Sequence, residues 1–291
     1  MKNKILATLL ALSLALALTA CGGSKTDDSA KTDDTNDAQT EQPAENQETV
    51  TLKVGASPTP HAEILQQCVP ILAEQGIDLQ ITEYGDYVIP NTAVEDGEND
   101  ANYFQHVPYL DNFNEENGTH LVSVTGVHIE PMGISAGKTA SLEELPDGAT
   151  VAVPNDATNE ARALQLLAAQ GLIELKEDAG LNATPNDITS NPKNLQFKEL
   201  EAAMLPQTAS EVDLSVINSN FAMEGGMNPA TDSLASEDAD SEAAQTFANI
   251  IAVKEGHEND PAIQALVKAL QSDKVKEYIE KTYSGAVVAV F

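Results

Sequence analysis

The chain has 291 residues, and its 46 acidic residues against 15 basic ones give a formal net charge of -31. Such a negative net charge excludes a protein that binds the phosphate backbone of nucleic acid, because such binding needs a basic surface. Apolar residues make up 42% of the chain. This share excludes wholesale disorder and suits one bilobed domain or two ordinary ones.

The N-terminus has the features of an exported protein. Lys2 and Lys4 precede a mainly apolar run at residues 5–18, which is too short to cross a bilayer comfortably and fits a signal peptide. The run ends in Leu18-Thr19-Ala20-Cys21, which resembles a bacterial lipobox. We therefore expect a lipoprotein signal peptide at residues 1–20 and acylation of Cys21, palmitate included. An ordinary signal peptide followed by an incidental cysteine is the alternative.

Residues 21–49 are almost all small, polar or acidic. Such a segment cannot bury enough apolar surface to fold, and its like charges extend it, so we interpret it as a disordered acidic tether. The only other cysteine is Cys68, and acylation of Cys21 would leave no intramolecular disulfide. Cys68 lies in an apolar helical pattern and is predicted to be a buried packing residue rather than a reactive thiol.

Hydrophobic patterns then predict an α/β protein. A strand at residues 50–54 is followed by a helix that begins at Thr59-Pro60 and ends at Gly76, and then by a strand at 79–83. Pro70 is expected to kink this helix. The β-α-β order indicates parallel strands.

The same alternation continues through the second half of the chain. Strands are predicted at residues 149–153, 212–216 and 249–253, and helices at 159–170 and from Asp260-Pro261 onward. Repeated alternation of this kind favours sheets flanked by helices.

Arg162 is the only arginine in the chain. Its planar guanidinium matches a carboxylate in a way that lysine cannot. It falls in the first turn of the helix predicted after strand 149–153, with Asn159 as a plausible cap. Ligands of open α/β sheets bind at this position, and the helix N-terminus favours a small anion there. A structural ion pair with one of the 46 acidic residues is the alternative.

Aromatic residues are scarce, at 4% with no tryptophan, yet they cluster between Tyr84 and Phe113. Several runs in and after this cluster resemble, in the same order, the methionine-binding lipoproteins of ABC importers. The runs are Asp86-Tyr87-Val88-Ile89-Pro90-Asn91, Asn102-Tyr103-Phe104-Gln105-His106, Pro108-Tyr109-Leu110-Asp111, Val151-Ala152-Val153-Pro154-Asn155-Asp156 with Asn159 and Arg162, Asn191-Pro192-Lys193-Asn194-Leu195, and Val216-Ile217-Asn218 before Phe221-Ala222. The resemblance extends from about residue 51 to the C-terminus.

The resemblance implies an α/β protein with the two-lobed fold of type II periplasmic binding proteins, in which each lobe is a mixed sheet flanked by helices and hinge strands join the lobes. Lobe 1 would comprise residues 51–133 plus 249–291, and lobe 2 residues 134–248. The protein would bind an amino acid, usually methionine, between the lobes without catalysis, cofactor or metal. It would be lipid-anchored on the extracytoplasmic face of the membrane, with the permease and ATPase subunits of an ABC importer as partners.

The resemblance also implies roles for individual residues. Arg162 would bind the ligand carboxylate, Asn218 would bind its polar backbone end, and Asn159 would contribute through its backbone. The side-chain pocket would be lined from lobe 1 by Tyr87, Tyr103, Phe104 and His106. An aromatic cage suits a thioether, because sulfur packs favourably against ring edges. Glu130 could balance a ligand ammonium, although we expect it to be an exposed carboxylate.

Three other readings stay open at this point. Changes in the cage could retune the site to another small amino acid or to a methionine-containing dipeptide. A metal-binding lipoprotein is a second alternative, since the chain has five histidines and many carboxylates, although His61, His106, His120 and His128 lack a recognisable ligand spacing. A hydrolase built on His106 is the third, and no pair of carboxylates announces itself by its spacing in the sequence to support it.

Overall fold

The computed structural model describes residues 49–291. The expected signal peptide, the acylated Cys21 and all but the last residue of the expected tether lie outside the described residues. Among residues 49–291, no helix combines the length and the apolar character that a membrane span requires.

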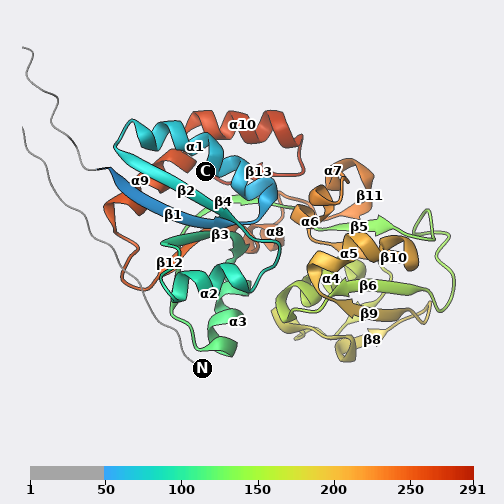
Figure 1. The fold of residues 1–291 in the computed structure, drawn as a ribbon. Helices are drawn as coiled ribbons and strands as arrows, with labels where there is room; N and C mark the ends of the chain where they lie inside the picture. The colour runs from blue at the N-terminus through green and yellow to red at the C-terminus, as the bar shows by residue number, and fades with distance from the viewer. Residues whose placement is uncertain (1–48) are drawn as a thin grey trace, which may run out of the picture. The chain divides into compact units, whose positions relative to one another are not determined.

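The described part contains two main sheets (Figure 1). The first is six-stranded, in the order β13-β4-β12-β3-β1-β2. Strands β1, β2 and β3 run parallel to one another, whereas β12 is antiparallel to both β3 and β4. The strands are β1 (Val50–Ala56), β2 (Ile77–Glu83), β3 (Ala101–His106), β4 (Leu121–Ile129), β12 (Asn249–Lys254) and β13 (Val288–Ala289).

The second sheet is five-stranded, in the order β11-β5-β10-β6-β9. Its centre is parallel, with β6 between β9 and β10, and β5 is antiparallel to β10. The strands are β5 (Gly133–Ala136), β6 (Thr150–Pro154), β9 (Gln196–Leu200), β10 (Leu214–Ile217) and β11 (Ser233–Ser236). A small two-stranded ladder, β7 (Glu174–Leu175) with β8 (Ile188–Ser190), lies in the same stretch of chain. Each lobe is therefore a mixed sheet.

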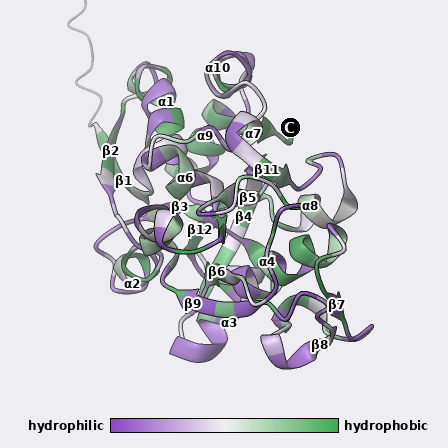
Figure 2. Cartoon of the chain, turned by 90° about the vertical axis from the view of Figure 1, so that its right-hand side faces the viewer, coloured by the Kyte–Doolittle hydropathy of each residue, from purple (hydrophilic) through white to green (hydrophobic). Residues whose placement is uncertain are grey.

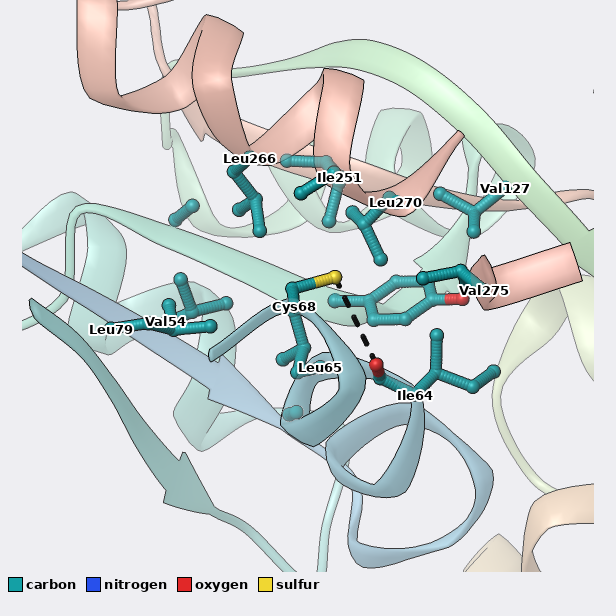
Figure 3. Packing of buried hydrophobic residues seen from close by; sticks show 14 of the residues in the cluster. Val54, Ile64, Leu65, Cys68, Leu79, Val127, Ile251, Leu266, Leu270 and Val275 are labelled. Carbon is teal, nitrogen blue, oxygen red and sulfur yellow. Dashed lines mark hydrogen bonds between the residues drawn. The ribbon is translucent and has the colours of Figure 1, made fainter. Parts of the chain in front are cut away.

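Helices of the first lobe cover its sheet and close its core. Helix α1 packs against α9, α10 and β2. The predicted packing role of Cys68 is confirmed: its side chain is fully buried among apolar residues (Figure 3), and burial raises the pKa of its thiol to about 12. Helix α1 continues through Pro70. The helices are α1 (Glu63–Ala73), preceded by a helical turn η1 (Pro58–Ala62), with α2 (Ile89–Glu95), α3 (Val107–Asn117), α9 (Pro261–Leu270) and α10 (Asp273–Tyr283).

The acidic residues of α10, namely Asp273, Glu277 and Glu280, are exposed. Helix α10 is hydrophilic along most of its length and buries only Val275, Ile279 and Tyr283 (Figure 2). The high net charge therefore coexists with an ordinary apolar interior.

In the second lobe, α4 (Ala157–Ala169) follows β6 and buries Leu164 and Leu167 completely. Its N-cap is Asp156, whose side chain accepts a hydrogen bond from the backbone N–H of Asn159. The expectation that Asn159 caps this helix is thus wrong, because the helix begins two residues earlier. The remaining helices are α5 (Leu205–Thr208), α6 (Ser219–Glu224), α7 (Pro229–Asp232) and α8 (Glu242–Thr246).

The chain passes between the two sheets twice. Residues 130–132 connect β4 to β5, and residues 237–248 connect β11 to β12. We call these the first and second crossings. Two hydrogen bonds join the crossings. The N–H of Glu237 donates to the carbonyl of Met132, and the N–H of Met132 donates to the carboxylate of Glu237.

Candidate functional site

A cavity lies where residues of the two lobes meet. In this arrangement its volume is about 20 Å³, which is room for about one water molecule. A ligand as large as an amino acid therefore requires the lobes or the lining side chains to separate. The lining residues are Tyr87, Phe104, Gln105, His106, Tyr109, Glu130, Asn159, Arg162, Asn218, Ser219, Asn220 and Asn249.

Six of the seven ligand-binding residues expected from the sequence lie in this cavity. The exception is Tyr103, which is fully buried in the core of the first lobe and bonds through its hydroxyl to Nδ1 of His128. On strand β3 the side chains of Tyr103 and Phe104 point to opposite faces, and only Phe104 borders the cavity.

One wall of the cavity is aromatic. The ring of Tyr87 lies 5.7 Å from that of Phe104, 5.7 Å from that of Tyr109 and 4.9 Å from that of Phe221 on α6. The Tyr87 hydroxyl donates to Oδ1 of Asn220 over 2.6 Å. These contacts join rings of the first lobe to a helix of the second.

His106 caps α3 and reaches across to the second lobe. Its Nδ1 accepts from the N–H of Tyr109, so its Nε2–H can donate to Oδ1 of Asn159 at 3.2 Å. The amide of Asn218 donates to the same oxygen over 2.9 Å. Burial, and next the charge of Arg162, lower the pKa of His106 to about 3, so the ring is neutral at physiological pH.

Arg162 is 4% exposed. Arg162 was expected in the first turn of α4. Since α4 begins at Ala157, Arg162 lies in the second turn instead. Its Nε and Nη2 donate to the two carboxylate oxygens of Glu237 at 2.8 and 2.6 Å, and Nη2 also donates to the carbonyl of Glu130 at 2.9 Å. The guanidinium carbon stands 4.4 Å above the ring of Phe247. Arg162 thus forms the structural ion pair that the sequence left open as an alternative role. Its Nη1 takes part in none of these hydrogen bonds.

Glu130 is buried, and the expectation of an exposed carboxylate is wrong. It begins the first crossing, which is packed between the lobes. Its Oε1 lies 2.7 Å from Nε2 of His128 and 3.2 Å from Nε2 of His61, and the backbone N–H of Asn220 also bonds to the carboxylate. Burial raises the pKa of Glu130, opposed by the nearby His61 and Arg162.

Asn218 supplies a free acceptor. Within residues 49–291 its Oδ1 is buried without a hydrogen-bond partner. A buried polar atom without a partner is costly and calls for an explanation. Asn218 shares the cavity with the guanidinium of Arg162 and the carboxylate of Glu130. A positive donor, a negative acceptor and a neutral acceptor therefore border the same small cavity.

One group of side chains could in principle hold a metal ion. Ligand atoms of His61, His128 and Glu130 lie within 4.8 Å of one another, an arrangement that the separations in sequence did not reveal. Both imidazole Nε2 atoms lie within hydrogen-bonding distance of the carboxylate, so a metal would have to displace those protons. Direct hydrogen bonds already account for the geometry of the group.

Sequence reasoning missed several lining residues. Gln105, Ser219 and Asn220 are direct neighbours of expected site residues, and Tyr109 belongs to the aromatic cluster. Asn249 opens β12, far along the chain, and only its pairing with His106 on β3 brings it here.

Two α/β lobes, joined by two crossings and enclosing a polar, aromatic-walled cavity, define the bilobed class of solute-binding proteins. Comparison with known proteins narrows this class. The sequence profile of the NlpA lipoprotein family matches residues 52–291, and the chain belongs to this family.

Similar proteins agree with that assignment. A lipoprotein of known structure from Ruminococcus gnavus is 58% identical, with a TM-score of 0.82, covering 83% of this chain and 99% of its own. A nutrient-binding protein from Burkholderia cenocepacia, solved bound to methionine, is 44% identical, with a TM-score of 0.78, and covers 82% of this chain and 100% of its own. The methionine-binding lipoprotein MetQ of Bacillus subtilis is 41% identical over 243 residues, which are 82% of this chain and 88% of the relative.

Proposed function

We propose that this protein is a lipid-anchored, extracytoplasmic solute-binding protein that captures an amino acid, L-methionine, between its lobes and delivers it to an ABC importer. The observation that carries the proposal is the composition of one buried cavity. A guanidinium, a carboxylate and an unpartnered amide oxygen border it together with an aromatic wall. A zwitterion with an apolar side chain complements all of these groups. Relatives named or solved as methionine-binding support the choice of ligand.

The charged groups suggest how the ligand lies. Its carboxylate binds Arg162, whose Nη1 is outside the ion pair with Glu237. Its ammonium binds Glu130 and the Oδ1 of Asn218, both acceptors. Charge-assisted hydrogen bonds of this kind are the strong ones, and their arrangement fixes the ligand's orientation.

The thioether side chain then lies among Tyr87, Phe104 and Tyr109. Sulfur packs favourably against aromatic ring edges, and an unbranched chain fits between rings without strain. His106 and Asn159 close this end by their hydrogen bond between the lobes. Neutral His106 keeps a second positive charge away from the apolar part of the ligand.

Binding requires the lobes to open and close. The present cavity of about 20 Å³ admits no amino acid, so ligand enters a more open form. Contacts that bridge the lobes, such as Tyr87 with Asn220, then favour the closed form. A ligand shifts this equilibrium by the contacts that it makes only when the lobes are shut.

Delivery of the ligand requires the importer subunits as partners and a location at the membrane. The permease and ATPase subunits of the importer receive the ligand, and acylated Cys21 holds the protein at the extracytoplasmic face of the membrane. The protein acts without catalysis, cofactor or metal: it releases the same molecule that it binds. The alternatives for the ligand are another small amino acid and a methionine-containing dipeptide.

The test is a calorimetric titration of L-methionine into protein that has been unfolded, dialysed and refolded to remove bound ligand. Arg162→Ala removes the charged partner of a buried carboxylate, a loss that costs about 2–5 kcal/mol, or roughly 30- to several-thousand-fold in affinity. Lys176→Ala is the control, because it removes a half-exposed cation of the same lobe. Unchanged affinity in Arg162→Ala would contradict the site. If the wild-type protein binds other amino acids but not methionine, the identification of methionine as the ligand is wrong.

A further inference from the structure

A chain of hydrogen-bonded, buried side chains adjoins the cavity on the side of the first lobe; we call Tyr103, His128, Glu130, His61 and Asn249 the row. The hydroxyl of Tyr103 bonds to Nδ1 of His128, and Nε2 of His128 lies 2.7 Å from Oε1 of Glu130. From the other side, Nε2 of His61 lies 3.2 Å from the same oxygen and 2.9 Å from Oδ1 of Asn249. Tyr103, His61 and His128 do not border the cavity, whereas Glu130 does.

Hydrogen-bond chemistry fixes the direction of this row. The ionised carboxylate of Glu130 can only accept, so its hydrogen bond with Nε2 of His128 places a proton on Nε2. Burial lowers the pKa of His128 to about 3, so the ring is neutral and Nε2 carries its only N–H. Nδ1 of the neutral ring then accepts from the hydroxyl of Tyr103, which keeps its proton because burial raises its pKa well above the ordinary value. Tyr103 thus stabilises the tautomer of His128 that donates to Glu130.

The hydrogen-bond donors to the carboxylate of Glu130 are neutral, and the charge of Arg162 acts on it without a direct ion pair. Burial also lowers the pKa of His61 to about 4, so both histidines are uncharged at physiological pH. Arg162 donates to the backbone carbonyl of Glu130, and within the described residues no lysine or arginine forms an ion pair with its side chain. A buried carboxylate without a directly paired cation is costly, and an ammonium entering the cavity supplies one.

We propose that Tyr103 and His128 are positioning residues that hold Glu130 as the receptor for a free α-ammonium, so that the site admits only ligands with an unblocked primary amine. This inference rests on the proposed function and specifies its ligand class. Oε1 bonds to His128 and lies 3.2 Å from Nε2 of His61, and the N–H of Asn220 also bonds to the carboxylate. The acceptor sites that remain on Glu130 serve the ligand. N-acylated amino acids, and dipeptides that carry methionine at their C-terminal position, lack the ammonium at this place and are excluded.

The experiment compares two ligands that differ only in the amine: L-methionine and its desamino analogue, 4-(methylthio)butanoate. Titrations are made with refolded wild-type protein, Tyr103→Phe, Glu130→Gln and the double variant. Tyr103→Phe removes one hydroxyl that acts on a buried charge, and we expect roughly a tenfold loss of methionine affinity. Affinity for the desamino analogue should stay unchanged. The double variant should bind methionine no worse than Glu130→Gln alone.

The matched control is Tyr283→Phe. Tyr283 is also a buried tyrosine of the first lobe, and its hydroxyl bonds to the carboxylate of Glu63 and the carbonyl of Pro60 rather than to His128. This variant reports the general cost of removing a buried hydroxyl. It should not change the ratio of the two affinities. Circular dichroism melting of each variant shows that it is folded.

A second readout is the pH dependence of methionine affinity. Loss of the fixed donor at His128 raises the pKa of Glu130, so the fall of affinity at low pH should begin at higher pH in Tyr103→Phe than in wild type or Tyr283→Phe. The other groups that act on Glu130 are retained in every single variant of Tyr103 and Tyr283: His61, His128, Arg162, the N–H of Asn220, Tyr87 and Glu224.

The outcomes are distinct. If wild-type protein does not bind methionine, the proposed function fails. If it does, and Glu130→Gln weakens methionine while Tyr103→Phe changes neither the affinity ratio nor the pH profile, the positioning roles are overturned and the function stands. Equal losses for both ligands in Tyr103→Phe would likewise overturn it, since they indicate a general loss of structure.

Discussion

Arg162 and Glu237 form a two-pronged ion pair, with Nε to Oε1 at 2.8 Å and Nη2 to Oε2 at 2.6 Å. Arg162 also binds the carbonyl of Glu130. Glu130 and Glu237 are the first residues of the two crossings between the lobes. The cation proposed to bind the ligand carboxylate is therefore fixed to both connections between the lobes.

We expect Glu237→Ala to lower the free energy of unfolding by about 3–5 kcal/mol, because it leaves the buried guanidinium without a counter-charge. Methionine affinity should fall as well, since the plane of the guanidinium is no longer fixed. Urea denaturation and calorimetry measure the two effects. The control is Glu277→Ala, which breaks an exposed pair with Lys281 and should leave the unfolding midpoint unchanged. Equal midpoints for both variants would contradict a stabilising role for the pair.

Tyr87→Phe removes a hydrogen bond between the lobes and keeps the ring in the aromatic wall. We expect roughly a fivefold loss of methionine affinity, which corresponds to about 1 kcal/mol for one hydrogen bond. Tyr84→Phe is the matched control, because the hydroxyl of Tyr84 bonds to Asn99 within the first lobe. Calorimetric titration of both variants decides the matter. A loss of the same size in Tyr84→Phe would show that the contact between the lobes has no special role.

Binding of methionine should depend on pH through Glu130. Burial raises the pKa of this carboxylate above its ordinary 4.5, and a ligand ammonium favours the ionised form. Binding therefore releases a proton where the free protein carries one, and affinity falls as the pH drops through the raised pKa. His61 and His128, with pKa values lowered to about 4 and about 3, are neutral above this range. Burial also raises the pKa of the nearby Glu224 to about 7, so its titration has to be separated from that of Glu130.

Titrations over a pH series in two buffers of different ionisation enthalpy measure both the affinity and the protons released. Glu130→Gln should abolish the release and flatten the profile. Release of protons that persists undiminished in that variant would assign the effect to another group.

Cys21→Ser should abolish membrane attachment. The thioether to the lipid requires the cysteine sulfur, so this variant should remain unprocessed or be released from the membrane. Mass spectrometry of the N-terminal peptide and fractionation of cells check both results. Cys68→Ala is the control, because that thiol is buried and protonated. Lipid found on the Cys21→Ser protein would contradict the assignment.

The sequence predicted five strands of the two main sheets, β1, β2, β6, β10 and β12, and did not predict β3, β5, β9, β11 and β13. Strands β1, β6 and β12 and helices α4 and α9 lie within a few residues of their expected bounds, because alternating and helical apolar patterns are local. The long strand β4 was not predicted. Its middle residues are half-exposed with no alternation, and its pairing with β12 brings together segments more than 100 residues apart.

The candidate site divides in the same way. Aromatic and polar residues of the cavity were recognisable as runs of unusual composition around Tyr87, His106 and Arg162. The place of Tyr103 behind the cavity was not, since the strand alternation that turns it away from Phe104 has both side chains buried. The burial of Glu130 was missed because, besides His128, it depends on His61 and Asn220, which are distant in sequence.

The sequence by itself determined the class of fold, the family and a short set of chemically suited residues, because those follow from periodicity and from residue types at fixed spacing. The tertiary structure alone decided which charges meet. Arg162 and Glu237 are 75 positions apart, and Tyr87 and Asn220 are 133 apart. Charge and burial at the site arise from such distant pairs, so only the packing of the two lobes shows a carboxylate held by neutral histidines beside a guanidinium that is already paired.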